Sequence, residues 1–139
     1  MANNYTEFSV LLPKVDEAEL VRFMEEVVAR QEEAEEDDDW ESMPLRGMEY
    51  NTRGGELWLH ADESGDVSAA EELIREFLNR FEIRGGVYMS WASTCSKPRI
   101  NQFEGGAMVV TRQDTLWVSA SDVLKMATDA GVEVLNEWE

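Results

Sequence analysis

The sequence predicts an α+β fold, and three observations lead to this prediction. Segments whose apolar residues alternate with period two are interrupted by two segments with helical periodicity. A helix-capping pattern precedes each helical segment. Turn residues separate the segments, including Gly-Gly pairs at 54–55 and 85–86. The chain has 139 residues, so we expect a single domain over residues 1–139.

The first strand and the first helix are predicted near the N-terminus. Tyr5–Leu12 shows apolar alternation and is followed by Pro13, which is typical of a strand and its end. Asp16 and Glu19 form a capping-box pattern that opens a helix. Apolar residues then recur at helical spacing and predict one buried stripe: Leu20, Val21, Met24, Val27 and Val28.

An acidic loop and a hairpin are predicted next. Beyond about Glu36 the sequence has no periodicity, which indicates a mobile acidic loop as far as about residue 46. Gly47–Thr52 and Glu56–Ala61 are then expected to form two strands. The turn between them contains Gly54 and Gly55, which permit the positive φ that a tight hairpin needs.

A second helix and a fourth strand complete the predicted core. Ser68 and Glu71 form the second capping-box pattern, and a second apolar stripe follows: Leu73, Ile74, Phe77, Leu78 and Phe81. Val87–Ala92 is the fourth strand. The order over residues 1–92 is therefore βαββαβ, which is the ferredoxin-like arrangement with both helices on one face of an antiparallel sheet.

Residues 93–139 are expected to extend this core with a β-hairpin and a short helix. In chain order we expect a long connection, two hairpin strands, a helix ended by Gly131 and a last extended segment: Ser93–Glu104, Ala107–Thr111, Thr115–Val118, Ser121–Ala130 and Val132–Glu139. No composition shift separates this extension as a domain of its own.

The bulk composition excludes several classes of protein. The formal net charge is −18, so we expect no direct binding to nucleic acid or to an anionic membrane, because phosphates would be repelled. No apolar run approaches the roughly 18 residues of a membrane span, and the N-terminus lacks the pattern of a signal peptide. Cys95 is the only cysteine, which excludes an internal disulfide and predicts a cytoplasmic location.

Acidic residues are concentrated between Asp16 and Glu41, where thirteen of 26 residues are Asp or Glu. Such concentrated charge destabilises a folded chain by self-repulsion, which suggests a role beyond solubility. We therefore expect this acidic stretch to mimic phosphates and to bind a basic nucleic-acid-binding protein. The residues expected to carry this binding are Glu19, Glu25, Glu26, Glu32, Glu33, Glu36, Asp37, Asp38, Asp39 and, as an apolar anchor, Trp40. The alternative is a solvated face that serves solubility only, as in salt-adapted proteins.

A second candidate surface is the sheet face opposite the helices, where alternation places Trp58, His60 and Tyr88. Aromatic side chains on an open sheet stack bases in RNA-recognition folds, but no basic rim accompanies these three. We favour the interpretation that the C-terminal hairpin and helix cover this face and that Trp58 is core. The alternative function is a sheet-face or edge-strand module that binds a small ligand or self-associates, as a monomer or weak homodimer.

No catalytic, cofactor or metal-binding pattern is recognised, so we predict neither an enzyme nor a cofactor. His60 is the only histidine, and the only possible dyad would join it to Cys95, around which no nucleophile motif exists. The acidic run Asp37–Asp39 lacks the glycine and the terminal glutamate of an EF-hand loop at the required offsets. The Gly-Gly pairs do not fit a phosphate-binding loop.

One segment carries a resemblance. The run from Trp91 to Arg99, followed by Phe103, Gly105-Gly106-Ala107 and Val109-Val110-Thr111, resembles a pattern in small uncharacterised proteins of phages and bacterial mobile elements. The match covers about 21 residues and transfers no residue role. It implies a small bacterial or phage cytoplasmic protein, such as an accessory or anti-defence factor. Lys97-Pro98-Arg99 within it is expected to be a rigid cationic turn that pairs internally with acidic residues, and the alternative is that it forms a small contact patch.

Overall fold

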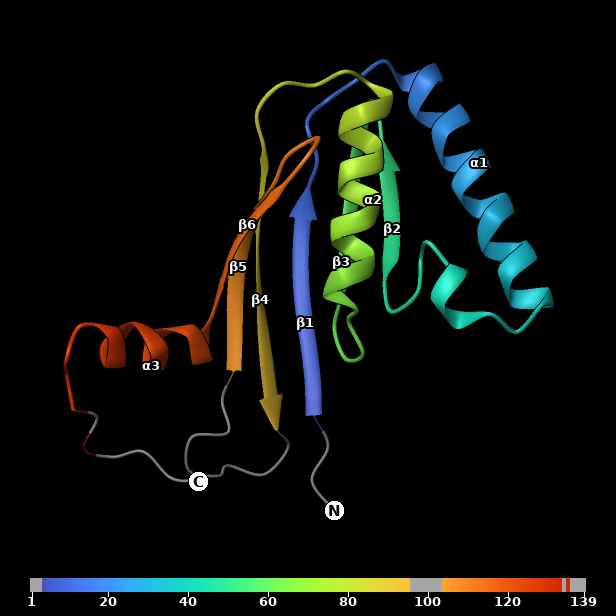
Figure 1. Ribbon diagram of the computed structural model, residues 1–139. Coiled ribbons are helices and arrows are strands. Elements are labelled where there is room, and N and C mark those ends of the chain that lie inside the picture. Colours follow the sequence, from blue (N-terminus) through green and yellow to red (C-terminus); the bar gives the residue numbers. More distant parts are fainter. Residues whose placement is uncertain (1–3, 96–103, 134, 136–139) are drawn as a thin grey trace.

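The computed structural model describes residues 4–95, 104–133 and 135 (Figure 1). The helices and strands follow the predicted order, with one short 3₁₀ helix, η1, between the first helix and the second strand. In chain order they are β1 (Asn4–Leu11), α1 (Glu17–Glu36), η1 (Trp40–Ser42), β2 (Glu49–Arg53), β3 (Glu56–Ala61), α2 (Val67–Arg80), β4 (Val87–Cys95), β5 (Glu104–Val110), β6 (Thr115–Ser119) and α3 (Ala120–Asp129).

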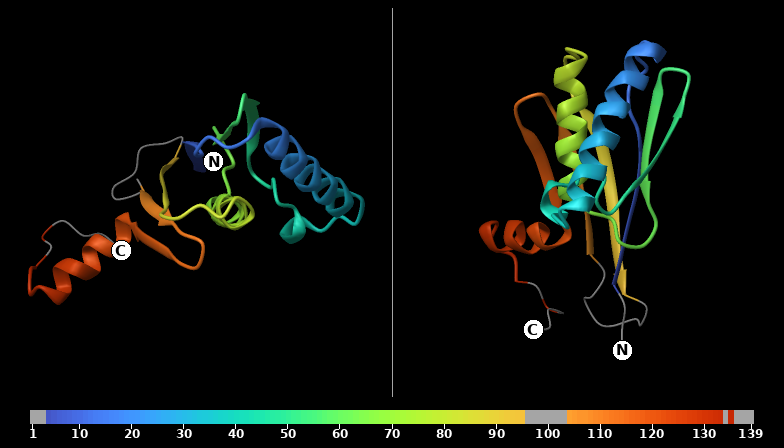
Figure 2. Two further views of the ribbon diagram at one scale, coloured as in Figure 1. Left: turned by 90° about the horizontal axis from the view of Figure 1, so that it is seen from above. Right: turned by 90° about the vertical axis from the view of Figure 1, so that its right-hand side faces the viewer.

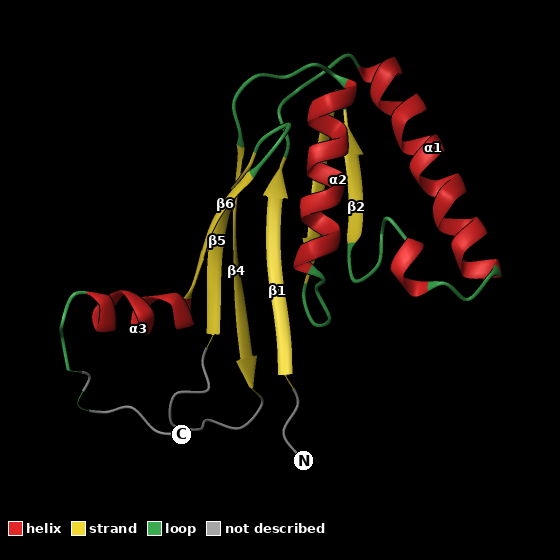
Figure 3. Cartoon of the chain, viewed as in Figure 1, coloured by secondary structure: helices red, strands yellow, loops and turns green. Residues whose placement is uncertain are grey.

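The strands form one six-stranded sheet in the order β2-β3-β1-β4-β5-β6, with every neighbouring pair antiparallel. The α+β class is therefore confirmed. Helices α1 and α2 lie on the same face of this sheet (Figures 2 and 3). No helix or strand among the described residues lies against the opposite face.

The expectation that the C-terminal hairpin covers the opposite face is wrong. Strand β4 runs past its predicted end to Cys95, and β5 pairs along it from Ser93 opposite Glu104 to Val87 opposite Val110. The backbone hydrogen bonds of β4 thus place the β5–β6 hairpin at the sheet edge, where it widens the sheet. As a result Trp58 is 42% exposed and is not a core residue.

The hydrophobic core fills the space between the sheet and the two helices. Phe23 of α1 packs edge-on against Phe77 of α2, with ring centroids 5.9 Å apart, and against Phe81, 5.8 Å away. The sheet and α2 supply most of the other fully buried side chains, which include Leu12, Leu57, Leu59, Leu73, Ile74, Leu78, Met89 and Val110. This packing fixes the position of α1 relative to α2.

The buried stripe of α1 differs from the predicted one. Phe23 and Ala34 are buried, whereas Val21 is 47% exposed and Val28 is only half-buried. At 3.6 residues per turn, this change rotates the buried stripe by roughly 50° toward α2. The physical reason is the contact of Phe23 with the two α2-side phenylalanine rings. The rotation brings Glu26 within reach of Arg80 of α2.

The predicted cap of α1 is present, whereas α2 is capped by a different residue from the predicted one. Asp16 caps α1 as expected, with its carboxylate accepting a hydrogen bond from the Glu19 backbone at 3.1 Å. For α2 the cap is Asp66 and not Ser68, because the Asp66 carboxylate accepts from the Ala69 backbone at 3.0 Å. Most of the extended segment expected over Val132–Glu139 lies outside the described residues.

Candidate interaction surfaces

The outward face of α1 carries a column of acidic side chains. Glu25, Glu32 and Glu36 are exposed and form no ion pair with any described residue. They lie opposite the buried stripe of the helix, and Glu25 and Glu32 border an open hollow between α1 and β2. Glu33 is also exposed and has no such partner.

Two of the predicted binding residues are engaged within the fold. Arg22 donates to Glu19 at 2.9 Å, and Arg80 of α2 pairs with Glu26. Because α1 is rotated toward α2, Glu26 reaches Arg80 of that helix, although its side chain stays 61% exposed. Glu26 thus belongs to the α1–α2 contact, which leaves it less available to a partner.

The segment after α1 forms local hydrogen bonds and a short 3₁₀ helix, where the sequence predicted a loop without regular structure. The Asp37 backbone donates to Glu33 at 3.2 Å, and Asp38 adopts a positive φ of 52°. Asp39 accepts a hydrogen bond from the Ser42 hydroxyl at 2.6 Å. Trp40 opens η1 and is exposed, as its predicted role as an apolar anchor requires.

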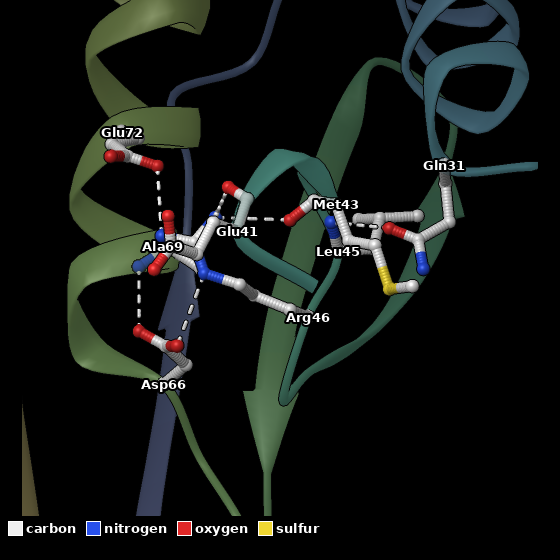
Figure 4. Close-up of polar contacts among 8 residues, drawn as sticks. All are labelled: Gln31, Glu41, Met43, Leu45, Arg46, Asp66, Ala69 and Glu72. Carbon is white, nitrogen blue, oxygen red and sulfur yellow. Dashed lines mark hydrogen bonds and ion pairs between the residues drawn. The ribbon is translucent and has the colours of Figure 1, made fainter. Parts of the chain in front are cut away.

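Arg46 anchors this acidic segment to α2, and sequence reasoning missed it (Figure 4). Its buried guanidinium donates to Asp66 at 3.1 Å and to Glu72 at 3.0 Å. It also donates to the backbone carbonyls of Glu41 and Met43, at 3.2 and 3.0 Å. One planar cation therefore joins the η1 segment to the N-terminal turns of α2, which suits the fork geometry of arginine.

A second contact ties the same segment to α1. The Leu45 backbone donates to the side-chain oxygen of Gln31 at 2.9 Å. Gln31 lies on the inner side of α1, and Leu45 packs partly against the core. Together with Arg46, this contact holds the acidic end of α1 and η1 in one position. We define the acidic surface as Glu25, Glu32, Glu33, Glu36, Asp37, Asp38, Asp39 and Trp40.

The open face of the sheet brings Trp58 and His60 together. Their rings stack with centroids 4.0 Å apart, and the Trp58 indole donates to the Ser9 hydroxyl at 2.7 Å. The His60 Nε2 lies 2.7 Å from the Asn51 side-chain oxygen. These residues border a shallow, open hollow of about 580 Å³. Tyr88 is exposed on the same face but does not line the hollow.

The candidate Cys95–His60 dyad is not assembled. Cys95 pairs with Asn4 in the β1–β4 ladder, whereas His60 pairs with Ser9, five residues farther along β1. Five residues of a strand span about 16 Å, which is far beyond hydrogen-bond reach. Among the described residues, no three His, Cys, Asp or Glu side chains gather closely enough to hold a metal ion.

Comparisons with protein-family models, with curated proteins and with solved structures found no match for this chain. The resemblance of the Trp91–Thr111 segment therefore stays a prediction, and its Lys97-Pro98-Arg99 turn lies outside the described residues. In the described part of the chain, no helix has both the length and the apolar content to cross a membrane.

Proposed function

We propose that this chain is a non-enzymatic interaction protein that binds a basic nucleic-acid-binding protein through the acidic surface. The observation that carries the proposal is the outward column of Glu25, Glu32 and Glu36, which have no ion pair among the described residues. Unpaired carboxylates on a rigid helix repel one another in the free protein. A cationic partner would remove that repulsion and would be steered to the surface by it.

The spacing of the column supports mimicry of a phosphate backbone. Glu25 and Glu32 are separated by about 10 Å along the helix axis, and Glu32 and Glu36 by about 6 Å. Successive phosphates of one DNA strand rise by about 3.4 Å, so these intervals approximate three and two phosphate steps. Asp37, Asp38 and Asp39 continue the charge beyond the helix, and Trp40 offers an apolar contact beside it.

The fold supports the presentation of this surface. We propose that residues 1–92 form a ferredoxin-like core, which the partial order β2-β3-β1-β4 within the sheet and the position of both helices on one face support. In that arrangement α1 packs at the side of the sheet that ends in β2, with its outer face unobstructed (Figure 1). If the resemblance to phage and mobile-element proteins holds, the natural targets would be bacterial defence effectors.

The test is capture of partners from a nuclease-treated bacterial lysate, followed by elution with duplex DNA. Three tagged forms are compared: wild type, Glu25→Lys/Glu32→Lys/Glu36→Lys, and the matched control Asp62→Lys/Glu63→Lys/Glu133→Lys. Both triple variants raise the net charge by the same amount, and all six positions are exposed. Glu26 is left intact because its reversal would break the ion pair with Arg80.

We expect wild type and the control to retain a nucleic-acid-binding protein that duplex DNA displaces. The α1 variant should lose that protein while keeping the circular dichroism spectrum of wild type. Equal retention by all three forms would show that general charge, and not this surface, is responsible. Retention of a partner that duplex DNA does not displace would contradict the proposal that the acidic surface mimics DNA.

A second candidate function is recognition of a small planar ligand in the open hollow, which the exposed Trp58–His60 stack favours. Such a ligand would extend the stack, with Ser9 and Ser90 as polar neighbours. Planar aromatic fragments should then shift the NMR signals of His60 in wild type but not in Trp58→Ala, with little dependence on salt. Shifts that survive in Trp58→Ala would exclude the hollow as the site.

A further inference from the structure

The two edges of the sheet differ in chemistry. Strand β2 forms one edge and carries Glu49 and Arg53, charges of the kind that protect an edge strand from pairing with another chain. Strand β6 forms the other edge and reads Thr-Leu-Trp-Val-Ser, without charge, proline or glycine. Its outer backbone donors and acceptors face no strand among the described residues. Such an edge is a template for strand addition.

Both faces of β6 are apolar and uncovered. Leu116, Trp117 and Val118 are 72%, 61% and 50% exposed, although successive residues of a strand point to opposite faces. The ladder with β5 places Trp117 opposite Met108, on the helix side, and places Leu116 and Val118 on the open side. Successive apolar side chains are exposed on both faces of a strand when no neighbouring strand covers one of its sides.

Helix α3 extends this surface beyond the edge. It follows β6 directly and projects away from the sheet on the side opposite α1 (Figures 1 and 2). Val123 and Met126 of α3 are exposed, on a helix whose main contacts among the described residues are with β5 and β6. An amphipathic helix in this position can lie across a chain added at β6.

We propose that β6 pairs antiparallel with β6 of a second copy of this chain, about a two-fold axis at Trp117. The strand is self-complementary in that register. Thr115 would lie opposite Ser119 of the second copy, Leu116 opposite Val118, and Trp117 opposite itself, so apolar residues meet apolar ones and no charged residues are opposed. The two sheets would join into one continuous sheet twice as wide.

The charge distribution selects this edge for self-association. A chain of net charge −18 resists dimerisation wherever its acidic residues would meet. Helix α1 lies toward the β2 edge, so pairing at β6 keeps the two acidic surfaces apart (Figure 1). Pairing at β2 would bring them together. The inference goes beyond the binding of a basic partner, uses no residue of the acidic surface, and gives the expected weak homodimer a specific interface.

Disulfide trapping tests both the dimer and its register. Each variant is made in a Cys95→Ser background, since Cys95 is the only cysteine. Residues directly opposite in an antiparallel ladder have Cα atoms about 4.5–5.5 Å apart, which is within the range of a disulfide. Trp117→Cys should therefore cross-link to itself under mild oxidation, whereas Leu116→Cys alone should not. A mixture of Leu116→Cys and Val118→Cys should form the mixed cross-link.

Sedimentation equilibrium supplies an independent readout without cysteines. Wild type should show a monomer–dimer equilibrium at protein concentrations up to roughly 1 mM, and the dimer should persist at about 1 M salt, where charges are screened beyond about 3 Å. Trp117→Lys should weaken the dimer at least about tenfold, because two like charges would face each other at the axis. The control Leu11→Lys lies at an exposed apolar position of the open face, away from this edge. It should change the dissociation constant of the dimer by less than about twofold.

A wild-type chain that stays monomeric at every concentration would overturn the proposal, and so would self-cross-linking by Leu116→Cys in place of Trp117→Cys. Circular dichroism of each variant separates loss of pairing from loss of fold. Neither result would affect capture of a DNA-displaceable partner by the acidic surface, so the two proposals fail independently.

Discussion

The acidic surface and the β6 edge, which pairs with no further strand among the described residues, lie at opposite sides of one sheet. The two were unequally visible in the sequence. The acidic surface is a run of neighbouring residues, so its charge was evident before its geometry was known. The apolar exposure at Leu116, Trp117 and Val118 exists only because of where the hairpin docks. Charge is thus a local property of the chain, whereas exposure of apolar residues depends on which elements cover them.

The largest effect on stability is expected from Arg46, on which the position of the acidic surface depends. Arg46→Ala removes four hydrogen bonds and leaves the partly buried Asp66 carboxylate without its cation. We expect the free energy of unfolding to fall by about 2–4 kcal/mol, measured by urea denaturation. The control Arg84→Ala, at an exposed position, should change it by less than about 0.5 kcal/mol. A loss of that smaller size for Arg46→Ala would mean that the anchor is dispensable.

A smaller effect of opposite sign is expected from the outward column. Glu25→Gln/Glu32→Gln/Glu36→Gln removes mutual repulsion without removing an ion pair, so stability at low salt should rise by about 0.5–1 kcal/mol. Glu26→Gln should instead lower stability slightly, by at most about 0.5 kcal/mol, because it loses an exposed pair with Arg80. Both changes are measured as the free energy of unfolding relative to wild type, by thermal or urea unfolding at low salt. Destabilisation by the triple variant would show that the column supports the fold.

The smallest effect concerns the start of α3, next to the β6 edge. Hydrogen bonds from the Ser119 backbone and then from its hydroxyl lower the pKa of Asp122 below its usual value of 3.8. The carboxylate is therefore favoured in the folded state, so its contribution is present above pH 3.8 and is lost as the pH falls through the lowered pKa. An NMR titration of Asp122 should give a midpoint below 3.8, and a midpoint at or above 3.8 would contradict the cap.

Local patterns predicted the elements of the fold well. The alternation of Glu56–Ala61 gave β3 with its observed bounds, and Asp16 caps α1 as its spacing to Glu19 indicated. These features depend on neighbouring residues alone. The docking of the β5–β6 hairpin could not be predicted in the same way, because an alternating strand can pair with an edge or pack over a face with the same sequence.

The candidate site was predictable in composition but not in detail. The acidic residues were found as a cluster, yet Glu26 is neutralised by Arg80, which lies 54 residues away in the sequence. The outward direction of Glu25 depends on Phe23, whose burial requires the rings of Phe77 and Phe81. Arg46 gave no signal, because an isolated arginine after Pro44 and Leu45 is indistinguishable from a surface residue until α2 is placed beside it.

The proposed function depends most directly on whether the outward column binds a partner in place of DNA. The deciding measurement is the affinity of a captured partner for wild type and for the Glu25→Lys/Glu32→Lys/Glu36→Lys variant, over a series of salt concentrations with and without competing duplex DNA. We predict binding by wild type that weakens steeply with salt and is displaced by DNA, and loss of that binding in the variant. Equal affinity of the two forms, or binding indifferent to salt and to DNA, would contradict the account.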